Sequence, residues 1–251
     1  MRGPVQRTYT GVRSMAGNGG LLEGVDVGTL SVPDLLGPLN EFEAKNAPEQ
    51  IFAAGKVQLF RAGPRVSIVG ARKATGVGLQ RARKLAKMLA EKGVVVVSGM
   101  AEGIDTAAHT AALAAGGKSV GVLGCPLDVL FGQADRALRI AMMREHLVLS
   151  QFPSGHPVLR SNFPRRNRTM AILTHATVIV EASDTSGSLS QGWEALRIGR
   201  PLFLMQSIVD NPDLKWPAEM REYGADVLGS EDLDLLFEAL PPSVEPQLLA
   251  F

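Results

Sequence analysis

The sequence predicts a doubly wound α/β fold, in which a mostly parallel sheet carries helices on both faces. From Arg65 onward, short apolar runs rich in β-branched residues alternate with longer segments rich in Ala, Leu and Arg. That alternation is typical of βαβ units and a parallel sheet. The runs are continuously apolar, as in VVVVS at 94–98, which indicates strands buried on both faces. The expected architecture is Rossmann-like.

The expected elements follow from this pattern in chain order. We expect strands at 66–70, 94–98, 119–124, 146–150, 177–182 and 201–205. We expect helices at 77–92, 105–115, 133–144, 165–174 and 187–198, and a helix–strand–helix stretch over 212–239 that completes the layer.

The domain organisation expected is one Rossmann-like domain over 65–240 with smaller segments around it. Residues 1–30 are rich in Gly and have no sustained apolar period, so we expect a flexible lead-in. Residues 31–64 contain short helical patterns and are expected to form a helical appendage. The proline-containing stretch 241–251 is expected to be a tail.

Composition limits the class of protein. A single cysteine, Cys125, cannot close an intrachain disulfide or build a Cys/His metal cluster, and we expect it to pack in the core. No apolar run is long enough for a membrane span, and the first twenty residues lack the apolar stretch of a signal peptide. We therefore expect a cytoplasmic protein without a membrane segment, metal or cofactor.

The net charge of +1 hides an uneven distribution of charge. Residues 210–245 contain ten acidic residues but only Lys215 and Arg221 as basic ones, so the rest of the chain is basic. A polyanionic partner is therefore compatible with the near-neutral total.

Ligands of such sheets bind beyond the carboxyl ends of the strands. After the first strand, GARKATGVG (70–78) leads into a helix, where Gly70 permits a tight turn and Arg72 and Lys73 suit a phosphate. Solvated loop charges explain the two cations equally well. The spacing is not GxGxxG and no acidic residue ends the second strand, so a dinucleotide site is poorly supported.

The loops after the second and fifth strands supply further polar groups. In SGMAEGIDTAAH (98–109), Gly99 flanks a turn and is expected, with Gly70, to form part of an anion cradle, and Asp105 with His109 invites a general-base interpretation. No nucleophile is placed beside that pair, so a helix cap with a hydrogen-bonded histidine is favoured. A second anion cradle is expected in EASDTSGSLS (181–190), from Ser186, Gly187 and Ser188 at a helix start.

The densest signal is LRSNFPRRNR (159–168), which holds four arginines and no acid. Arginines pair with phosphates, an aromatic ring can stack on an unpaired base, and an amide can bond a base edge. A solvated basic face is the competing interpretation, but the interleaved Phe-Pro favours single-stranded nucleic acid. The candidate residues are Arg160, Phe163, Arg165, Arg166, Asn167 and Arg168.

These motifs resemble the DNA-processing protein A family (DprA, also called Smf), whose members mediate natural transformation. The resemblance covers about 66–228 and rests on VSIVGARKAT, VVVVSGMAEGIDTAAH, SVGVLGCPLD, FPRRNR and VIVEASDTSGSL, which occur in the family's order. It implies a Rossmann domain that holds single-stranded DNA in a basic pocket, helps to load the RecA recombinase and forms a homodimer.

The same resemblance implies roles for individual residues. Arg72 would contact phosphate, Lys118 would lie at the pocket rim, and Phe163 would stack on or wedge a base. Arg165, Arg166 and Arg168 would follow the DNA backbone. Asn167 would hold the basic box, FPRRNR at 163–168, in shape or touch a base. The chain departs from the family pattern at 131–135, 149–151 and 205–207, outside the basic box.

Two other functions compete with DNA binding. The chain also resembles, more distantly, the lonely-guy phosphoribohydrolases, which would make it an enzyme acting on nucleotides. Gln191 stands where that family has its catalytic Glu, and a neutral amide cannot act as a general base, so we expect no catalytic activity. A nucleotide-sensing module is the third hypothesis.

Overall fold

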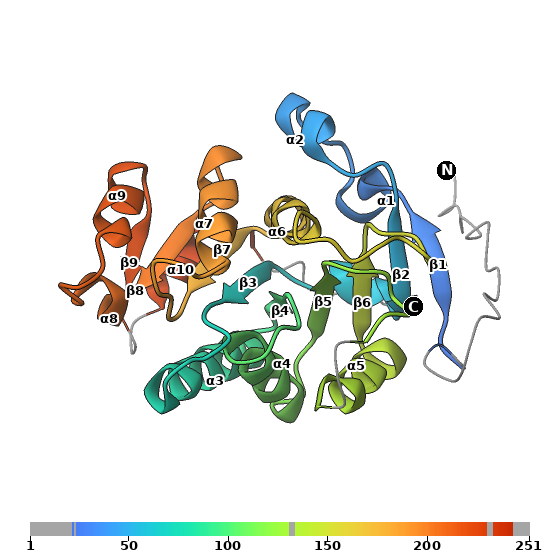
Figure 1. Ribbon diagram of the computed structural model, residues 1–251, viewed down its shortest axis with the longest axis horizontal. Helices are drawn as coiled ribbons and strands as arrows, with labels where there is room; N and C mark the ends of the chain where they lie inside the picture. Colours follow the sequence, from blue (N-terminus) through green and yellow to red (C-terminus); the bar gives the residue numbers. More distant parts are fainter. Residues whose placement is uncertain (1–21, 23, 131–133, 230–232, 243–251) are drawn as a thin grey trace, which may run out of the picture.

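The computed structural model describes residues 22, 24–130, 134–229 and 233–242. Within them a nine-stranded sheet has the order β1-β2-β6-β5-β4-β3-β7-β8-β9 (Figure 1). The strands are β1 Val27–Leu30, β2 Ile51–Gly55, β3 Arg65–Val69, β4 Val95–Ser98, β5 Ser119–Leu123, β6 Leu147–Ser150, β7 Ala176–Ile179, β8 Leu202–Met205 and β9 Asp226–Leu228.

Helices cover both faces of this sheet. In Figure 1, α3, α4 and α5 lie on one face, and α6, α7 and the N-terminal helices α1 and α2 lie on the other. The helices are α1 Val32–Leu36, α2 Glu41–Asn46, α3 Gly76–Glu91, α4 Ile104–Ala114, α5 Ala134–Glu145, α6 Asn162–Leu173, α7 Ser188–Arg197, α8 Gln206–Val209, α9 Trp216–Glu222 and α10 Asp234–Glu238, with a 3-10 turn η1 over Val57–Arg61.

The predicted fold class is confirmed. The six predicted strands form β3 to β8, which pair in parallel because each is joined to the next by a helical crossover. Their apolar runs are buried on both faces, as expected; all four residues of β4 are inaccessible. The stretch 212–239 gives α9, β9 and α10.

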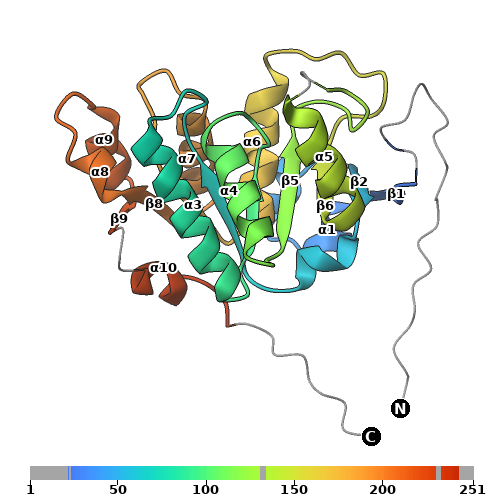
Figure 2. The ribbon, with the colours of Figure 1, turned by 90° about the horizontal axis from the view of Figure 1, so that it is seen from below.

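The order of the strands creates a switch point. From β3 the chain winds through β4 and β5 to β6 in one direction, then returns to place β7, β8 and β9 on the other side of β3. The loops after β3 and β7 therefore diverge at the carboxyl edge, along the upper side of Figure 2. Such a divergence leaves a crevice where ligands of doubly wound folds bind.

The helical appendage predicted at 31–64 is helical only in part. α1 and α2 are present, but Ile51–Gly55 forms β2, which pairs antiparallel with β6 and with β1. The sequence IFAAG is short and contains Ala and Gly, which are uncommon in strands, so its pairing depends on the exposed edge of β6. The flexible lead-in predicted for 1–30 is wrong at its end, because Val27–Leu30 forms β1. Most of its other residues, and most of the predicted tail at 241–251, lie outside the described residues.

Helix α6 begins at Asn162, three residues before the predicted start. The predicted start at 165 leaves Phe163 and Pro164 outside the helix. Pro164 instead lies in the first turn, where a missing N–H costs no hydrogen bond. The earlier start puts Phe163 on the helix, with its side chain fixed relative to the arginines that follow.

Candidate nucleic-acid interface

Two adjoining cavities open at the carboxyl edge of the sheet. The larger, about 710 Å³, lies at the switch point between the loops after β3 and β7, and we call it the switch-point cavity. The smaller, about 270 Å³, lies beyond the ends of β4 and β5, and we call it the side cavity. Both are lined by Arg72, Ala101, Phe163 and Arg166.

Arg72 and Phe163 stand together where the two cavities meet. The Arg72 guanidinium lies 5.7 Å from the centre of the Phe163 ring, within cation–π range. The ring lies so close to Gly124 that a Cβ there would approach its Cδ1 to 2.7 Å. The Arg72 loop itself rests on Gly103, which has φ +81° and whose missing Cβ would meet the carbonyl oxygens of Ala71 and Arg72 at 2.3 Å.

The Arg166 side chain is buried in the protein rather than exposed on its surface. Its Nη1 donates to the carbonyls of Gly99 at 2.8 Å and Val122 at 2.7 Å, which ties the ends of β4 and β5 together. Burial lowers the pKa of Arg166, and the nearby Asp105 opposes that shift. Gly99 is required here, because a Cβ would stand 2.1 Å from Arg166 Nη1. Arg166 therefore forms the floor shared by both cavities.

Asn167 holds the box to the loop after β7. Its Nδ2 donates to the Gly187 carbonyl at 3.1 Å, and its Oδ1 accepts from Arg166 Nε at 2.9 Å. Gly187 is the N-cap residue of α7 and Ser188 begins that helix. Ser186, Gly187 and Ser188 all line the switch-point cavity, as the predicted second cradle requires.

The helix start after β3 is already occupied by a carboxylate. Glu181 Oε1 accepts from the amide of Thr75 at 2.7 Å, and Oε2 accepts from the Thr75 hydroxyl at 2.6 Å. Gly78 leaves the space for it, since a Cβ would lie 2.2 Å from Oε2. Glu181 therefore takes the Thr75 amide at this helix start, and Arg72 and Lys73 are the cationic part of the loop, whose predicted contact with a phosphate stays a prediction.

The charges lining the switch-point cavity are mainly basic. Its carboxylates, Glu181 and Asp105, are both engaged in hydrogen bonds within the protein. The lining cations are Arg72, Lys73, Arg81 and Arg166. An anion entering this cavity therefore meets a net positive field.

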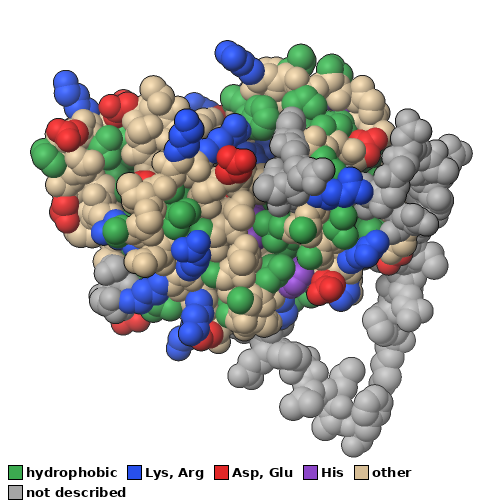
Figure 3. Space-filling model, turned by 60° about the horizontal axis from the view of Figure 1, so that its bottom comes forward, with side chains coloured by type: hydrophobic (Ala, Val, Ile, Leu, Met, Phe, Trp, Pro, Cys, Tyr) green, Lys and Arg blue, Asp and Glu red, His purple; other side chains and the backbone are tan. Residues whose placement is uncertain are grey.

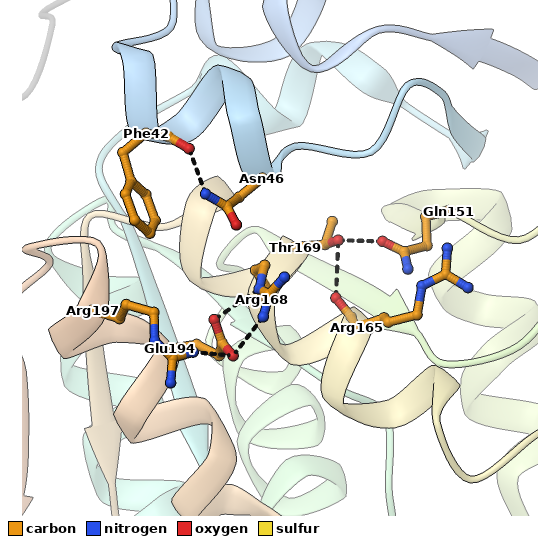
Figure 4. Close-up of polar contacts among 8 residues, drawn as sticks. All are labelled: Phe42, Asn46, Gln151, Arg165, Arg168, Thr169, Glu194 and Arg197. Atoms are coloured by element: carbon orange, nitrogen blue, oxygen red, sulfur yellow. Dashed lines mark hydrogen bonds and ion pairs between the residues drawn. The ribbon is translucent and has the colours of Figure 1, made fainter.

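Arg165 and Arg168, the other two arginines of FPRRNR, point elsewhere. Arg168 turns toward α7 and forks onto Glu194, with Nε–Oε2 2.9 Å and Nη2–Oε1 3.3 Å, and Arg197 shares that carboxylate (Figure 4). Arg165 is exposed and lies over the Phe152 ring at 5.3 Å. Neither residue lines either cavity. Their predicted contacts with DNA are untested.

Lys118 does not lie at the pocket rim, and that prediction is corrected. The residue immediately precedes β5, so it sits at the amino edge of the sheet, opposite the cavities. Its Nζ donates to the Ala62 carbonyl at 3.2 Å. A parallel strand carries its first and last residues to opposite edges, which separates Lys118 from the loop after β5.

Asp105 and His109 do not form a general-base pair. Asp105 Oδ2 accepts from the amides of Gly99 at 3.1 Å and Ala101 at 3.3 Å, and its pKa is raised by burial. His109 is completely buried, with Nδ1 2.7 Å from the hydroxyl of Ser119, and burial lowers its pKa to about 4. Because Gly99 uses its amide on Asp105, it is not a free donor for the predicted cradle.

Sequence reasoning missed three polar residues of these cavities. Arg81 follows the Arg72 loop by two helical turns, Thr75 caps α3, and Arg139 reaches the side cavity from α5. A helical projection of 76–91 would have brought Arg81 to the carboxyl edge. Nothing in the sequence around Arg139 distinguishes it from the other arginines of α5.

The described part of the chain holds neither a metal-binding cluster nor a membrane-spanning helix. There, no group of three or more His, Cys, Asp or Glu side chains could hold a metal ion. Within the same residues, no helix combines the length and apolar character that a bilayer crossing needs.

The family model for DNA recombination-mediator protein A matches residues 33–239. This chain belongs to that family. DNA processing protein DprA of Streptococcus pneumoniae is 38% identical over 183 residues, which cover 72% of this chain and 64% of the relative. Protein Smf of Escherichia coli is 33% identical over 190 residues, 75% of this chain and 50% of the relative. The chain thus spans less than two thirds of the length of these DprA/Smf proteins. The predicted resemblance to the DprA/Smf family is confirmed.

Solved structures of the family agree with this fold. DprA from S. pneumoniae superposes with a TM-score of 0.73 at 34% identity, covering 82% of this chain and 73% of that one. DNA processing protein A from Helicobacter pylori, described as binding single-stranded DNA, gives 0.71 at 26% identity, covering 84% and 94%. A molybdenum cofactor binding protein from Rippkaea orientalis, at 17% identity and a TM-score of 0.53, covers 70% and 96% and shares the fold alone.

Proposed function

We propose that this chain binds single-stranded DNA in the switch-point cavity, with Arg72 and Lys73 on phosphates and the Phe163 ring against an unpaired base. The observation that carries the proposal is the pairing of an exposed guanidinium with an aromatic ring at the mouth of a cationic cavity. Arginine neutralises phosphate, and every base offers a face for stacking. The single-stranded DNA binding described for the H. pylori relative supports it.

The position of Phe163 favours a single strand over a duplex. The ring is half-buried between Arg72 and Gly124, so a base must leave its stack to reach it. In a duplex that step costs unpairing and unstacking energy. A single strand offers its bases without the unpairing cost.

The arginine box has divided roles in this proposal. Arg165, which is exposed, extends the phosphate path beyond the cavity, and Arg166 with Asn167 fixes the cavity floor. Arg168 reaches a phosphate only by sharing or leaving Glu194. Lys118 is left out of the path because it lies at the opposite edge of the sheet.

The wider role proposed is that of a mediator without catalysis. We infer that the bound strand is passed to a RecA-type recombinase in the cytoplasm during natural transformation, and that the protein acts as a homodimer. Support comes from membership of the recombination-mediator family and from the neutral amide of Gln191 in the cavity.

The proposal is tested by titrating fluorescent oligo(dT) at several salt concentrations. We expect log affinity to fall with log salt by about 0.7 for each phosphate neutralised on a single strand. Arg72→Met should weaken binding and reduce that slope by about 0.7. Phe163→Ala should lower the affinity by about 1–3 kcal/mol with the slope retained, because stacking does not depend on counterions.

Lys87→Met is the matched control, since it removes one charge from the exposed far part of α3. It should leave affinity and slope close to those of the unmodified protein. Salt-independent binding, or equal losses in Arg72→Met and Lys87→Met, would refute the proposed site.

The hydrolase hypothesis has its own test. The protein is incubated with nucleoside monophosphates and released base is measured by chromatography. Release above that in buffer, abolished by Arg72→Met, would replace the binding role with an enzymatic one.

A further inference from the structure

The side cavity contains a buried arginine that has no ion-pair partner among the residues that the structure describes. Arg139 is only 2% exposed, the largest fully buried side chain among the described residues. Its Nη1 donates to the Val129 carbonyl at 2.6 Å and lies 3.9 Å from Cys125 Sγ. Its Nε has no hydrogen-bond partner, and no ion pair found among the described residues includes it.

The groups around Arg139 do not neutralise it. Burial raises the pKa of the Cys125 thiol, which therefore stays uncharged near neutrality. The Val129 carbonyl contributes only a dipole. An unpaired buried cation is costly, so its position next to an open cavity calls for a compensating anion.

The charged residues in the rest of the side-cavity lining are also mainly cationic, as an anion-binding site requires. Arg166 forms its floor and Arg72 its mouth, and both line it together with Arg139. The one carboxylate in its lining, Glu102, is exposed. Asp105 lies near Arg166 and already accepts two backbone amides. Three guanidinium groups thus face a space of about 270 Å³.

We infer that the side cavity is a binding site for a phosphoryl group, held between Arg139 and Arg166 with Arg72 at its mouth. Guanidinium groups bind phosphate oxygens by charge-assisted, often bidentate hydrogen bonds. The phosphoryl group has two sources, a free phosphate or the terminal phosphate of a strand lying in the switch-point cavity. The second source rests on the proposed function, because the two cavities meet at Phe163.

The first arm of the test uses inorganic phosphate alone. Thermal unfolding is measured in phosphate and in chloride at equal ionic strength. We expect phosphate to raise the Tm of the unmodified protein and of Arg136→Met, a matched change on the exposed part of α5. Arg139→Met should lose this response while its Tm in chloride is equal or higher, since an apolar side chain of similar size replaces an unpaired charge.

The second arm changes the ligand and leaves the protein intact. Oligo(dT) carrying a 5′-phosphate, a 3′-phosphate or neither is titrated at fixed salt. We expect one terminal phosphate to tighten binding about tenfold, the effect of one added charge-assisted contact. That difference should vanish in Arg139→Met, whereas affinity for the unphosphorylated strand should be kept.

The outcomes separate this inference from the proposed function. A response to inorganic phosphate alone assigns the site to a free phosphate, and a terminal-phosphate effect assigns it to a strand end. The inference is overturned if neither phosphate source has an effect, or if Arg139→Met responds like Arg136→Met. Failure of the proposed function is seen separately, as loss of binding to the unphosphorylated strand.

Discussion

At the scale of the residue, Glu181 limits where an anion can bind in the switch-point cavity. Its carboxylate accepts from the amide and hydroxyl of Thr75 and fills the start of α3, a position where a phosphate would otherwise gain from the helix dipole. A phosphate in the cavity is thereby directed toward Arg72 and Lys73. The same carboxylate places a negative charge in the lining, which would repel the strand of the proposed function.

Replacing Glu181 tests both effects. Glu181→Gln removes the charge and keeps the shape, so oligo(dT) affinity should rise about two- to tenfold at low salt and less at high salt, because screening weakens the lost repulsion. Stability should fall by roughly 1 kcal/mol as the charged cap is lost. Fluorescence anisotropy and urea unfolding measure the two quantities.

Glu194→Gln provides the comparison, because Glu194 pairs with Arg168 and Arg197 outside the cavities. It removes the same charge but should change oligonucleotide affinity little if Arg168 stays off the DNA. A larger gain in affinity from Glu194→Gln than from Glu181→Gln would place the strand over Arg168 and contradict the path proposed above.

At the scale of the element, α6 is positioned by close contacts with strand ends. Arg166 bonds the carbonyls of Gly99 and Val122 at the ends of β4 and β5, in the space that Gly99 leaves, and Phe163 rests on Gly124 directly after β5. The helix begins at Asn162, early enough to carry both side chains, and Pro164 is tolerated in its first turn. The orientation of the basic box is therefore set by two glycines outside the box.

Gly124→Ala tests this dependence. The new Cβ would lie 2.7 Å from Phe163 Cδ1, so the ring must tilt away. We expect a loss of about 1–3 kcal/mol in stability from overpacking, and weaker oligo(dT) binding with an unchanged salt slope. Thermal unfolding and anisotropy provide the two readouts.

Gly76→Ala is the matched control, because a Cβ there meets no atom within 4 Å and Gly76 begins α3 with ordinary backbone geometry. It should be neutral or slightly stabilising. If Gly124→Ala binds DNA as well as Gly76→Ala does, the Phe163 ring does not contribute to binding.

At the scale of the whole molecule, two histidines make stability depend on pH. His109 is completely buried beside Ser119, and burial lowers its pKa to about 4. His175 accepts from the Arg65 amide, and burial with the charges of Arg65 and Arg200 lowers its pKa to about 4. Both imidazoles are neutral in the folded protein and take up protons near pH 6.5 when it unfolds.

The free energy of unfolding should therefore fall as pH decreases from about 6.5 toward 4, since the unfolded chain then binds more protons. His109 contributes at most about 1.4 kcal/mol per pH unit in that range. Urea unfolding at pH 7, 6 and 5 measures the slope, and His109→Gln should reduce it. An identical slope in that variant would show that His109 does not titrate as described.

The distribution of positive charge over the surface is also a property of the whole molecule. Lysine and arginine side chains are scattered over the face drawn in Figure 3. The cationic groups used by the proposed function lie in the two cavities, where the few carboxylates are hydrogen-bonded or exposed, and at the exposed Arg165 outside them.

The sequence by itself determined the parallel α/β core and the identity of the basic box, because continuous apolar strands and arginines near Phe163 are local features. It could not show that β2 joins the edge of β6, since that pairing depends on a distant strand. It also could not assign directions to the arginines. Tertiary packing turned Arg168 toward Glu194, placed Arg166 at the ends of β4 and β5, and buried Arg139 without an ion-pair partner among the described residues. The sequence alone could not show this, because the direction of a charged side chain depends on contacts with residues far along the chain.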